Sequence, residues 1–181
     1  MNIIKEITAK YQGVYEEEIK KSTIYASGKY SFHPEKGVFE VAGSKLSVNI
    51  QAVGGAAQVT EPYRIILYLK KPFNGKLEIY PTTILNKIYW YIFKSSKLSL
   101  SSKIDKYYSF KGNKQLIKKL KKDKEFCEVL KPETVYITLN KKHPKHILLK
   151  PAYGLDTIEQ LERFIKLLKS IENEINSNFS F

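Results

Sequence analysis

Four short runs of β-forming residues follow one another in the first half of the chain, and turn signals separate them. The predicted strands are Val38 to Ala42, Lys45 to Val53, Tyr63 to Lys70 and Lys76 to Tyr80. The connections at 43–44 and 72–75 contain Gly, Pro and Asn, which favour the backbone conformations of tight turns. Strands joined by such short connections pair antiparallel, so we expect an antiparallel meander.

The second run has the clearest alternation. Its apolar residues Leu46, Val48, Ile50 and Ala52 alternate with the polar residues Ser47, Asn49 and Gln51. Successive side chains of a strand point to opposite faces of the sheet. The pattern therefore predicts a strand with one buried face and one face in water.

Amphipathic helices are predicted at both ends of the chain. Apolar residues recur every three to four positions from Ile3 to Lys21, which predicts an N-terminal helix with surface ion pairs between residues 16 and 20 and between 17 and 21. The same spacing runs from Ile158 to Ile175. The residues 156–159 ahead of it have the Asp-x-x-Glu spacing of a capping box, which predicts that the C-terminal helix begins near Asp156.

The middle of the chain mixes predicted helices and strands. They are a helix from Ile84 to Lys94, a strand from Lys106 to Lys111, a lysine-rich helix with Asn113 as its N-cap that runs to about Leu130, and a hairpin of Thr134 to Asn140 and His146 to Lys150. Because the strands cluster instead of alternating strictly with helices, we expect an α+β fold. Its antiparallel sheet would be packed by the N-terminal, internal and C-terminal helices.

Length and composition fit one folded domain. The chain has 181 residues, of which 43% are hydrophobic, and this is enough to form a core without disulfides or metals. We therefore expect a single globular domain over residues 1–181. It would consist of a charge-balanced part at 1–83, a lysine-rich part at 84–151 and the C-terminal helix at 156–176.

Positive charge is concentrated in the lysine-rich part. The formal net charge is +13, and residues 84–151 hold 17 lysines against five acidic residues. Such a surplus attracts nucleic acids and other polyanions. The arginines are only Arg64 and Arg163, however, and arginine is the better reader of phosphates and guanine edges. This argues against sequence-specific DNA recognition, and an A/T-rich coding sequence would produce the same lysine excess without selection for charge.

The candidate binding residues are lysines of the predicted helix and hairpin. They are Lys114, Lys118, Lys121, Lys122, Lys141, Lys142 and Lys145. On a helical wheel, the helix lysines cover all of the surface that Leu116 and Leu120 leave, which is the pattern of an ordinary solvated face. A surface that holds a polyanion is the alternative.

Aromatic residues interleave with these lysines at positions 89–91, 93, 107 and 108. If they are exposed, nucleic-acid bases could stack on them, but aromatic residues of helices and strands are usually buried. The stretch 87–94 also has the flanking lysines of a membrane-surface helix, although its short length fits a core helix equally well.

The sequence contains no recognisable catalytic or metal-binding motif. His143 and His146 flank Pro144 at the hairpin tip, but a catalytic zinc site needs a third protein ligand, and the neighbouring lysines would repel a cation. Cys127 has no histidine beside it in sequence, and the small residues at 54–57 lack the spacing of a phosphate-binding loop. We therefore predict no cofactor, and nothing in the sequence supports an enzyme.

The chain shows neither a signal peptide nor an apolar stretch long enough to span a membrane, so we expect a cytoplasmic protein. The leading hypothesis is a non-catalytic binding or accessory module with an acidic protein partner. The alternative is a protein that binds nucleic acid without sequence preference through the lysine-rich surface.

Overall fold

The computed structural model describes residues 2–19, 21–25, 28–32, 34–50, 63–82 and 103–178. The helices are α1 (Ile3–Lys10), η1 (Lys103–Lys106), α3 (Lys114–Lys122), α4 (Lys124–Leu130) and α5 (Ile158–Asn178). The strands are β1 (Val14–Glu17), β2 (Lys21–Tyr25), β3 (Gly28–Phe32), β4 (Glu35–Val41), β5 (Ser44–Ile50), β6 (Tyr63–Tyr68), β7 (Leu77–Pro81), β8 (Tyr108–Gly112), β9 (Val135–Leu139) and β10 (His146–Pro151). The predicted helix at 84–94 lies outside the described residues.

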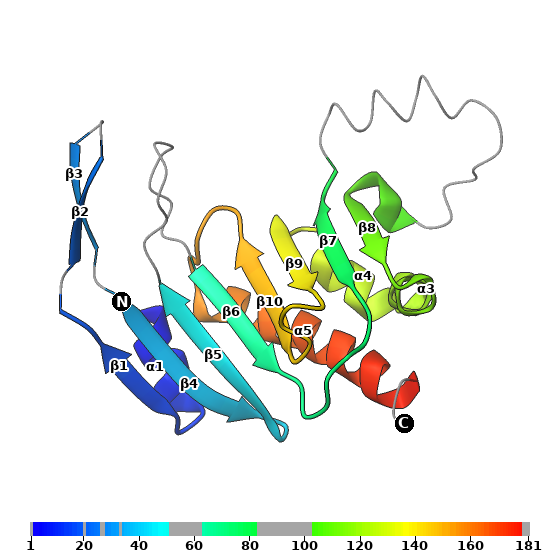
Figure 1. Cartoon of the computed structure of the whole chain (residues 1–181), viewed down its shortest axis with the longest axis horizontal. Coiled ribbons are helices and arrows are strands. Elements are labelled where there is room, and N and C mark those ends of the chain that lie inside the picture. Colours follow the sequence, from blue (N-terminus) through cyan, green and yellow to red (C-terminus); the bar gives the residue numbers. More distant parts are fainter. Residues whose placement is uncertain are drawn as a thin grey trace.

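An eight-stranded antiparallel sheet organises the fold, with the strand order β1-β4-β5-β6-β10-β9-β7-β8 (Figure 1). The predicted α+β class is therefore confirmed. A simple meander is correct only for β4, β5 and β6, because the β9–β10 hairpin pairs between β6 and β7. Strands β2 and β3 form a separate two-stranded sheet.

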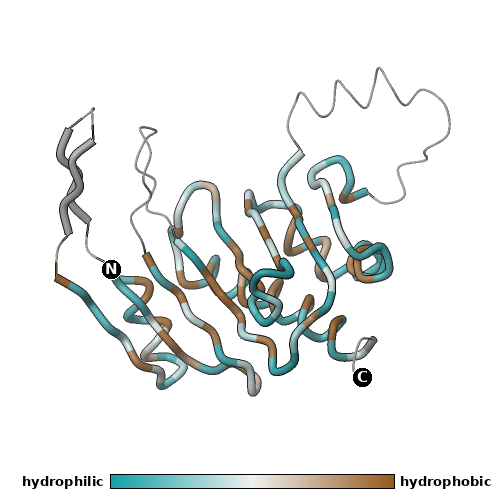
Figure 2. Tube along the Cα trace, in the orientation of Figure 1, coloured by the Kyte–Doolittle hydropathy of each residue, from teal (hydrophilic) through white to brown (hydrophobic). Residues whose placement is uncertain are grey.

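The helices α1, α3, α4 and α5 lie against one face of the large sheet (Figure 1). The long helix α5 crosses behind β6 and β10 and supplies Leu161, Phe164, Leu168 and Ile171 to the core, each completely buried. Inward-facing residues of the strands, including Leu46, Ile65, Leu67, Ile137 and Leu149, are also fully buried. In Figure 2 the outer strands mix apolar and polar residues, whereas the central strands β6 and β10 contain unbroken apolar runs at 65–67 and 147–149.

The predicted N-terminal helix is correct only as far as Lys10. Gln12 has a φ of 52°, which a continuing α-helix does not allow, and a Cβ on Gly13 would lie 2.3 Å from the carbonyl oxygen of Val38. The chain then continues as strand β1, paired with β4. Consequently Glu16 forms its ion pair with Lys36 across the sheet, at 3.6 Å, rather than with a residue four positions along a helix.

The lysine-rich helix is two helices. Asn113 is the predicted N-cap, since its side chain accepts a hydrogen bond from the backbone N–H of Leu116 at 3.0 Å. Asp123, however, has an extended backbone (φ −70°, ψ 105°) and caps a second helix by accepting from Phe126 N–H at 3.1 Å. An Asp inside the predicted helix thus acts as a cap because its short carboxylate competes for backbone donors.

The C-terminal helix is confirmed, but its cap is one residue later than predicted. Thr157 Oγ1 accepts from the backbone N–H of Gln160 at 3.1 Å, and the Gln160 side chain accepts from Asp156 N–H at 3.0 Å. The predicted wet face of β5 is wrong at Ser47 and Asn49, which are 1% and 8% exposed. The Ser47 hydroxyl lies 3.2 Å from that of Tyr68 on β6.

A buried charged cluster fastens α5 to the turn between β4 and β5. Glu172 is 2% exposed and accepts hydrogen bonds from Ser44 Oγ at 2.7 Å and from Lys169 Nζ at 2.6 Å. Lys169 also donates to the carbonyl oxygen of Ala42 at 3.3 Å. The turn uses positive φ at Ala42 and Gly43, as a two-residue hairpin connection does.

Candidate binding surface

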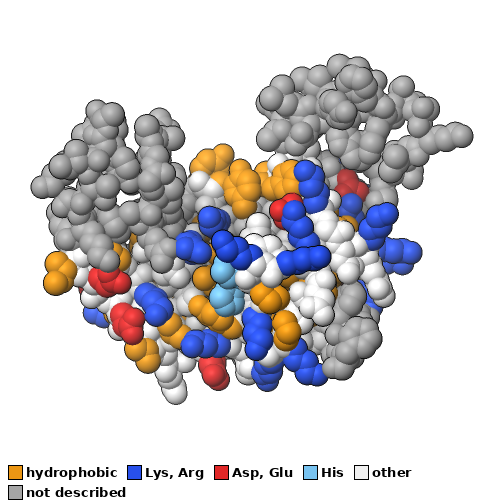
Figure 3. All heavy atoms as spheres, in the orientation of Figure 1, with side chains coloured by type: hydrophobic (Ala, Val, Ile, Leu, Met, Phe, Trp, Pro, Cys, Tyr) orange, Lys and Arg blue, Asp and Glu red, His pale blue; other side chains and the backbone are white. Residues whose placement is uncertain are grey.

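The face of the large sheet that these helices do not cover is here named the open face. Its side chains alternate along each strand with the buried core positions, and they include Lys45, Ile66, Tyr68, Glu78, Tyr80, Lys111, Tyr136, Thr138, His146 and Leu148. Figure 3 shows lysine and hydrophobic side chains mixed across it, with histidine near the centre. The open face is therefore amphipathic, and the exposed lysines of the adjoining β9–β10 hairpin add positive charge beside it.

The four candidate lysines of α3 do not have equal surroundings. Lys114, Lys118 and Lys122 are exposed. Lys121 is only 20% exposed along its side chain, forms an ion pair with Asp105 at 2.5 Å and lies 4.9 Å from the ring centroid of Phe110. Lys121 therefore joins α3 to the neighbouring η1 and β8 segments.

The candidate lysines of the β9–β10 hairpin are all exposed. They are Lys141, Lys142 and Lys145. The turn that carries them is well anchored, because Asn140 Oδ1 accepts from His143 N–H at 3.0 Å and the carbonyl oxygens of Pro144 and Lys145 accept from Phe73 and Leu69 at 2.9 and 2.8 Å. The hairpin thus holds a fixed position beside the end of β6.

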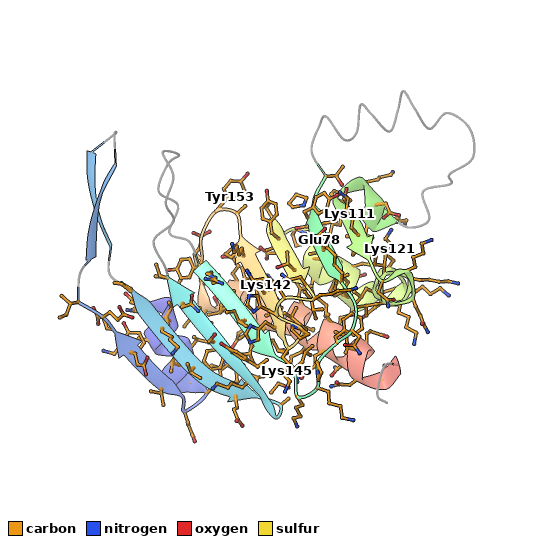
Figure 4. The ribbon with its side chains drawn as sticks, viewed as in Figure 1. Glu78, Lys111, Lys121, Lys142, Lys145 and Tyr153 are labelled. Atoms are coloured by element: carbon orange, nitrogen blue, oxygen red, sulfur yellow. The ribbon has the colours of Figure 1, made fainter. Side chains whose placement is uncertain are left out.

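The seven candidate lysines fall into two groups. Figure 4 places Lys121 beside α3 at one end of the sheet, and Lys142 and Lys145 nearer the middle. Helix α3 contacts α4, α5 and β8, whereas the hairpin strand β10 lies between β6 and β9. The sequence spacing could not reveal this separation, because it depends on the insertion of β9–β10 into the sheet.

Most acidic residues of the lysine-rich part have partners of their own. Asp105 pairs with Lys121, Glu125 with Lys166 at 2.5 Å, and Glu133 with Arg163 at 2.8 Å. Asp123 serves as a helix cap. Within the described ranges, no carboxylate forms an ion pair with Lys114, Lys118, Lys122, Lys141, Lys142 or Lys145.

Sequence reasoning missed two open-face residues beside the hairpin, Lys45 and Tyr68. The Lys45 Nζ lies 5.6 Å from the Tyr68 ring centroid, and Tyr68 meets the His146 ring edge-on at 4.9 Å. The rings of His143 and His146 are stacked with their centroids 5.6 Å apart. Alternation within β5 and β6 places Lys45 and Tyr68 on the open face, but only the strand order brings them to the histidines.

Among the described aromatic residues, Tyr136 and Tyr153 are 48% and 78% exposed, whereas the rings near the candidate lysines are buried or covered. Tyr108 is 2% exposed, which excludes it from stacking on a base. Tyr107 is 44% exposed but has the Lys131 Nζ over its ring at 5.2 Å, and Lys111 lies over Tyr80 at 5.2 Å. The aromatic residues 89–91 and 93 lie outside the described residues.

The described residues contain no group of three His, Cys, Asp or Glu side chains placed to hold a metal ion. Cys127 is half-buried in α4, and burial raises the pKa of its thiol. Within the described part of the chain, none of the helices combines the length and apolar character needed to cross a bilayer.

Comparison with known proteins adds a fold relationship. No family model matches the chain, and no curated protein matches its sequence. Among solved structures, it is similar to the mycobacterial trehalose monomycolate transport factor A, TtfA, with a TM-score of 0.54 and 10% sequence identity. The match covers 94% of this chain and 91% of that chain. At this identity the likeness concerns the fold alone.

Proposed function

We propose that the chain is a non-catalytic accessory module that binds an acidic protein partner through its lysine-rich surface. The observation that supports this proposal is the set of exposed lysines on α3 and the β9–β10 hairpin that no described carboxylate neutralises. Unneutralised charges of one sign steer a partner of opposite charge and determine its orientation. A cytoplasmic location and a single domain over residues 1–181 belong to the same proposal.

The surroundings of the aromatic rings favour a protein partner over nucleic acid. Binding of single strands without sequence preference relies on bases stacked on open aromatic faces. In this chain, lysine side chains already lie over Tyr68, Tyr80, Tyr107 and Phe110. Only Tyr136 and Tyr153 among the described tyrosines are exposed without a lysine over the ring. Carboxylates need no ring face, since they accept hydrogen bonds directly from lysine. Nucleic-acid binding is therefore the second candidate.

Two triple variants with the same change in charge test the proposal. One carries Lys141→Glu, Lys142→Glu and Lys145→Glu in the hairpin, and the other carries Lys114→Glu, Lys118→Glu and Lys122→Glu in α3. Partner capture from source cells by the tagged protein is measured with and without nuclease. We expect a protein partner that survives nuclease, with a loss of about tenfold in capture for the hairpin variant and a smaller loss for the α3 variant.

Both variants should keep the melting temperature of the parent protein, because all six side chains are exposed. Two results would contradict the proposal. Material that disappears after nuclease treatment would indicate nucleic acid, and equal capture by the parent protein and both variants would exclude the lysine-rich surface.

A further inference from the structure

A row of four side chains crosses the open face beside the hairpin. It consists of Lys45 from β5, Tyr68 from β6, His146 at the start of β10 and His143 in the turn before it. Figure 3 shows the histidine side chains at the surface, with lysines around them. Strand pairing fixes the row, since His146 is the register partner of Tyr68, and β6 is paired with β5.

The two imidazoles are available to a ligand. His143 is exposed and His146 is partly exposed, and among the described residues no hydrogen bond reaches a ring nitrogen of either one. Burial, and secondarily the neighbouring His143, lowers the pKa of His146 from its ordinary value. The lowered pKa favours the uncharged imidazole of the unliganded His146.

The surroundings of the histidines are mostly cationic. The titratable and charged groups on the neighbouring segments are Glu40 on β4, Lys45 on β5, Tyr68 on β6, Lys70 and Lys71 after β6, and Lys141, Lys142 and Lys145 in the hairpin. Glu40 is opposite Lys45 in the β4–β5 pairing. An approaching carboxylate thus meets several ammonium groups and two imidazoles, all of which can donate hydrogen bonds to it.

We propose that this row, with Lys142 and Lys145, is the docking site for a run of aspartate or glutamate side chains in the partner protein, and that the imidazole of His146 takes up a proton when the site is filled. This inference rests on the proposed function and names the place where the acidic partner docks. A carboxylate beside an imidazole favours the charged imidazolium. Because binding then takes up a proton, the affinity must rise as the pH falls.

The occupant is a carboxylate-bearing protein segment rather than a nucleic-acid strand. The ring of Tyr68 has Lys45 over it and the edge of His146 against it, which leaves it poorly placed for a base. Carboxylates of glutamate stay ionised across the pH range from about 8 to about 6, so the change in affinity with pH reports the imidazole of His146.

The experiment measures binding of an oligoglutamate peptide labelled with tetramethylrhodamine, a dye that does not titrate in this range, to the full chain by fluorescence anisotropy, from about pH 8 to about pH 6 at constant ionic strength. The test variant is the double substitution His143→Gln and His146→Gln. We expect the Kd of the parent protein to fall by about fivefold over this range. The double variant should match the parent protein at the alkaline end and show no change with pH.

The outcomes separate this inference from the proposed function. A Kd that is independent of pH, or a double variant that keeps the parent's pH dependence, overturns the role of the histidines while leaving peptide binding intact. Absence of peptide binding at every pH overturns both. A labelled oligouridylate of equal charge serves as the competing probe, and tighter binding of that probe with the same pH dependence would assign the site to nucleic acid.

Discussion

The two faces of the large sheet are built from the same strands but have different chemistry. On the helix-covered face, aliphatic and aromatic side chains are fully buried, and the charged cluster of Glu172 and Lys169 is internally paired. On the open face, lysine, tyrosine and histidine alternate with those core residues, and exposed lysines of the hairpin have no described acidic partner. The helix-covered face therefore holds most of the buried apolar side chains, and the exposed side chains of the open face are available for binding.

The largest expected difference between the faces comes from two adjacent leucines on β10. Leu149 is fully buried on the helix-covered face, whereas Leu148 is partly exposed on the open face. Leu149→Ala should lower the free energy of unfolding by about 3 kcal/mol, because it removes buried methyl groups and leaves a cavity. Leu148→Ala should cost about 1.5 kcal/mol, because part of its side chain is already in water. Urea unfolding measures both, and equal costs would show that the open face is also a core surface.

The next largest expected difference in stability is between variants of two carboxylates, Glu172 and Glu78. Glu172→Ala leaves Ser44 and Lys169 without their buried acceptor, and should cost about 2 kcal/mol, since Lys169 can still turn partly toward water. Glu78 on the open face forms a partly exposed ion pair with Lys76 at 3.0 Å. Glu78→Ala should therefore cost less than about 1 kcal/mol.

Thermal unfolding of these two variants checks the comparison. A loss of stability from Glu78→Ala as large as that from Glu172→Ala would contradict the larger contribution of the helix-covered face to stability. A large loss of stability from Glu172→Ala alone would show that the buried charged cluster between α5 and the β4–β5 turn stabilises the fold.

Local patterns predicted the elements of the helix-covered face well. The alternation in 45–50 and the helical spacing in 158–175 both correspond to observed elements, since each depends on a period that the sequence shows directly. The prediction errors arose where a tertiary contact or a helix cap determines the local secondary structure. Residues 14–17 have helical spacing but pair with β4, and Asp123 divides one predicted helix because its carboxylate caps the second.

The candidate site was less predictable than the fold. Sequence reasoning selected the exposed lysines of α3 and the hairpin but could not separate them, because the position of β9–β10 between β6 and β7 is a long-range feature. The same insertion brings His146 beside Tyr68 and Lys45, which are far from it in sequence. The binding role of the seven lysines and the choice of an acidic partner stay predictions.

The smallest expected effect compares two tyrosine hydroxyls. Tyr108 belongs to the buried core, where its hydroxyl donates to the carbonyl oxygen of Glu133 and accepts from the backbone N–H of Val135 at 3.2 Å. Tyr136 on the open face is 48% exposed. Tyr108→Phe should cost about 1 kcal/mol at neutral pH, and Tyr136→Phe should cost almost nothing.

The pH dependence sharpens this last prediction, because burial raises the pKa of Tyr108 to about 12. The folded protein keeps the phenol proton at a pH where the unfolded chain, with a tyrosine pKa of about 10, has begun to lose it. This contribution to stability is complete below the unfolded pKa and is lost as the pH rises from about 10 to about 12. Urea unfolding across that range should therefore show a steeper alkaline loss for the parent protein and Tyr136→Phe than for Tyr108→Phe. An identical loss of stability in all three proteins would mean that ionisation of the Tyr108 phenol does not contribute to alkaline unfolding.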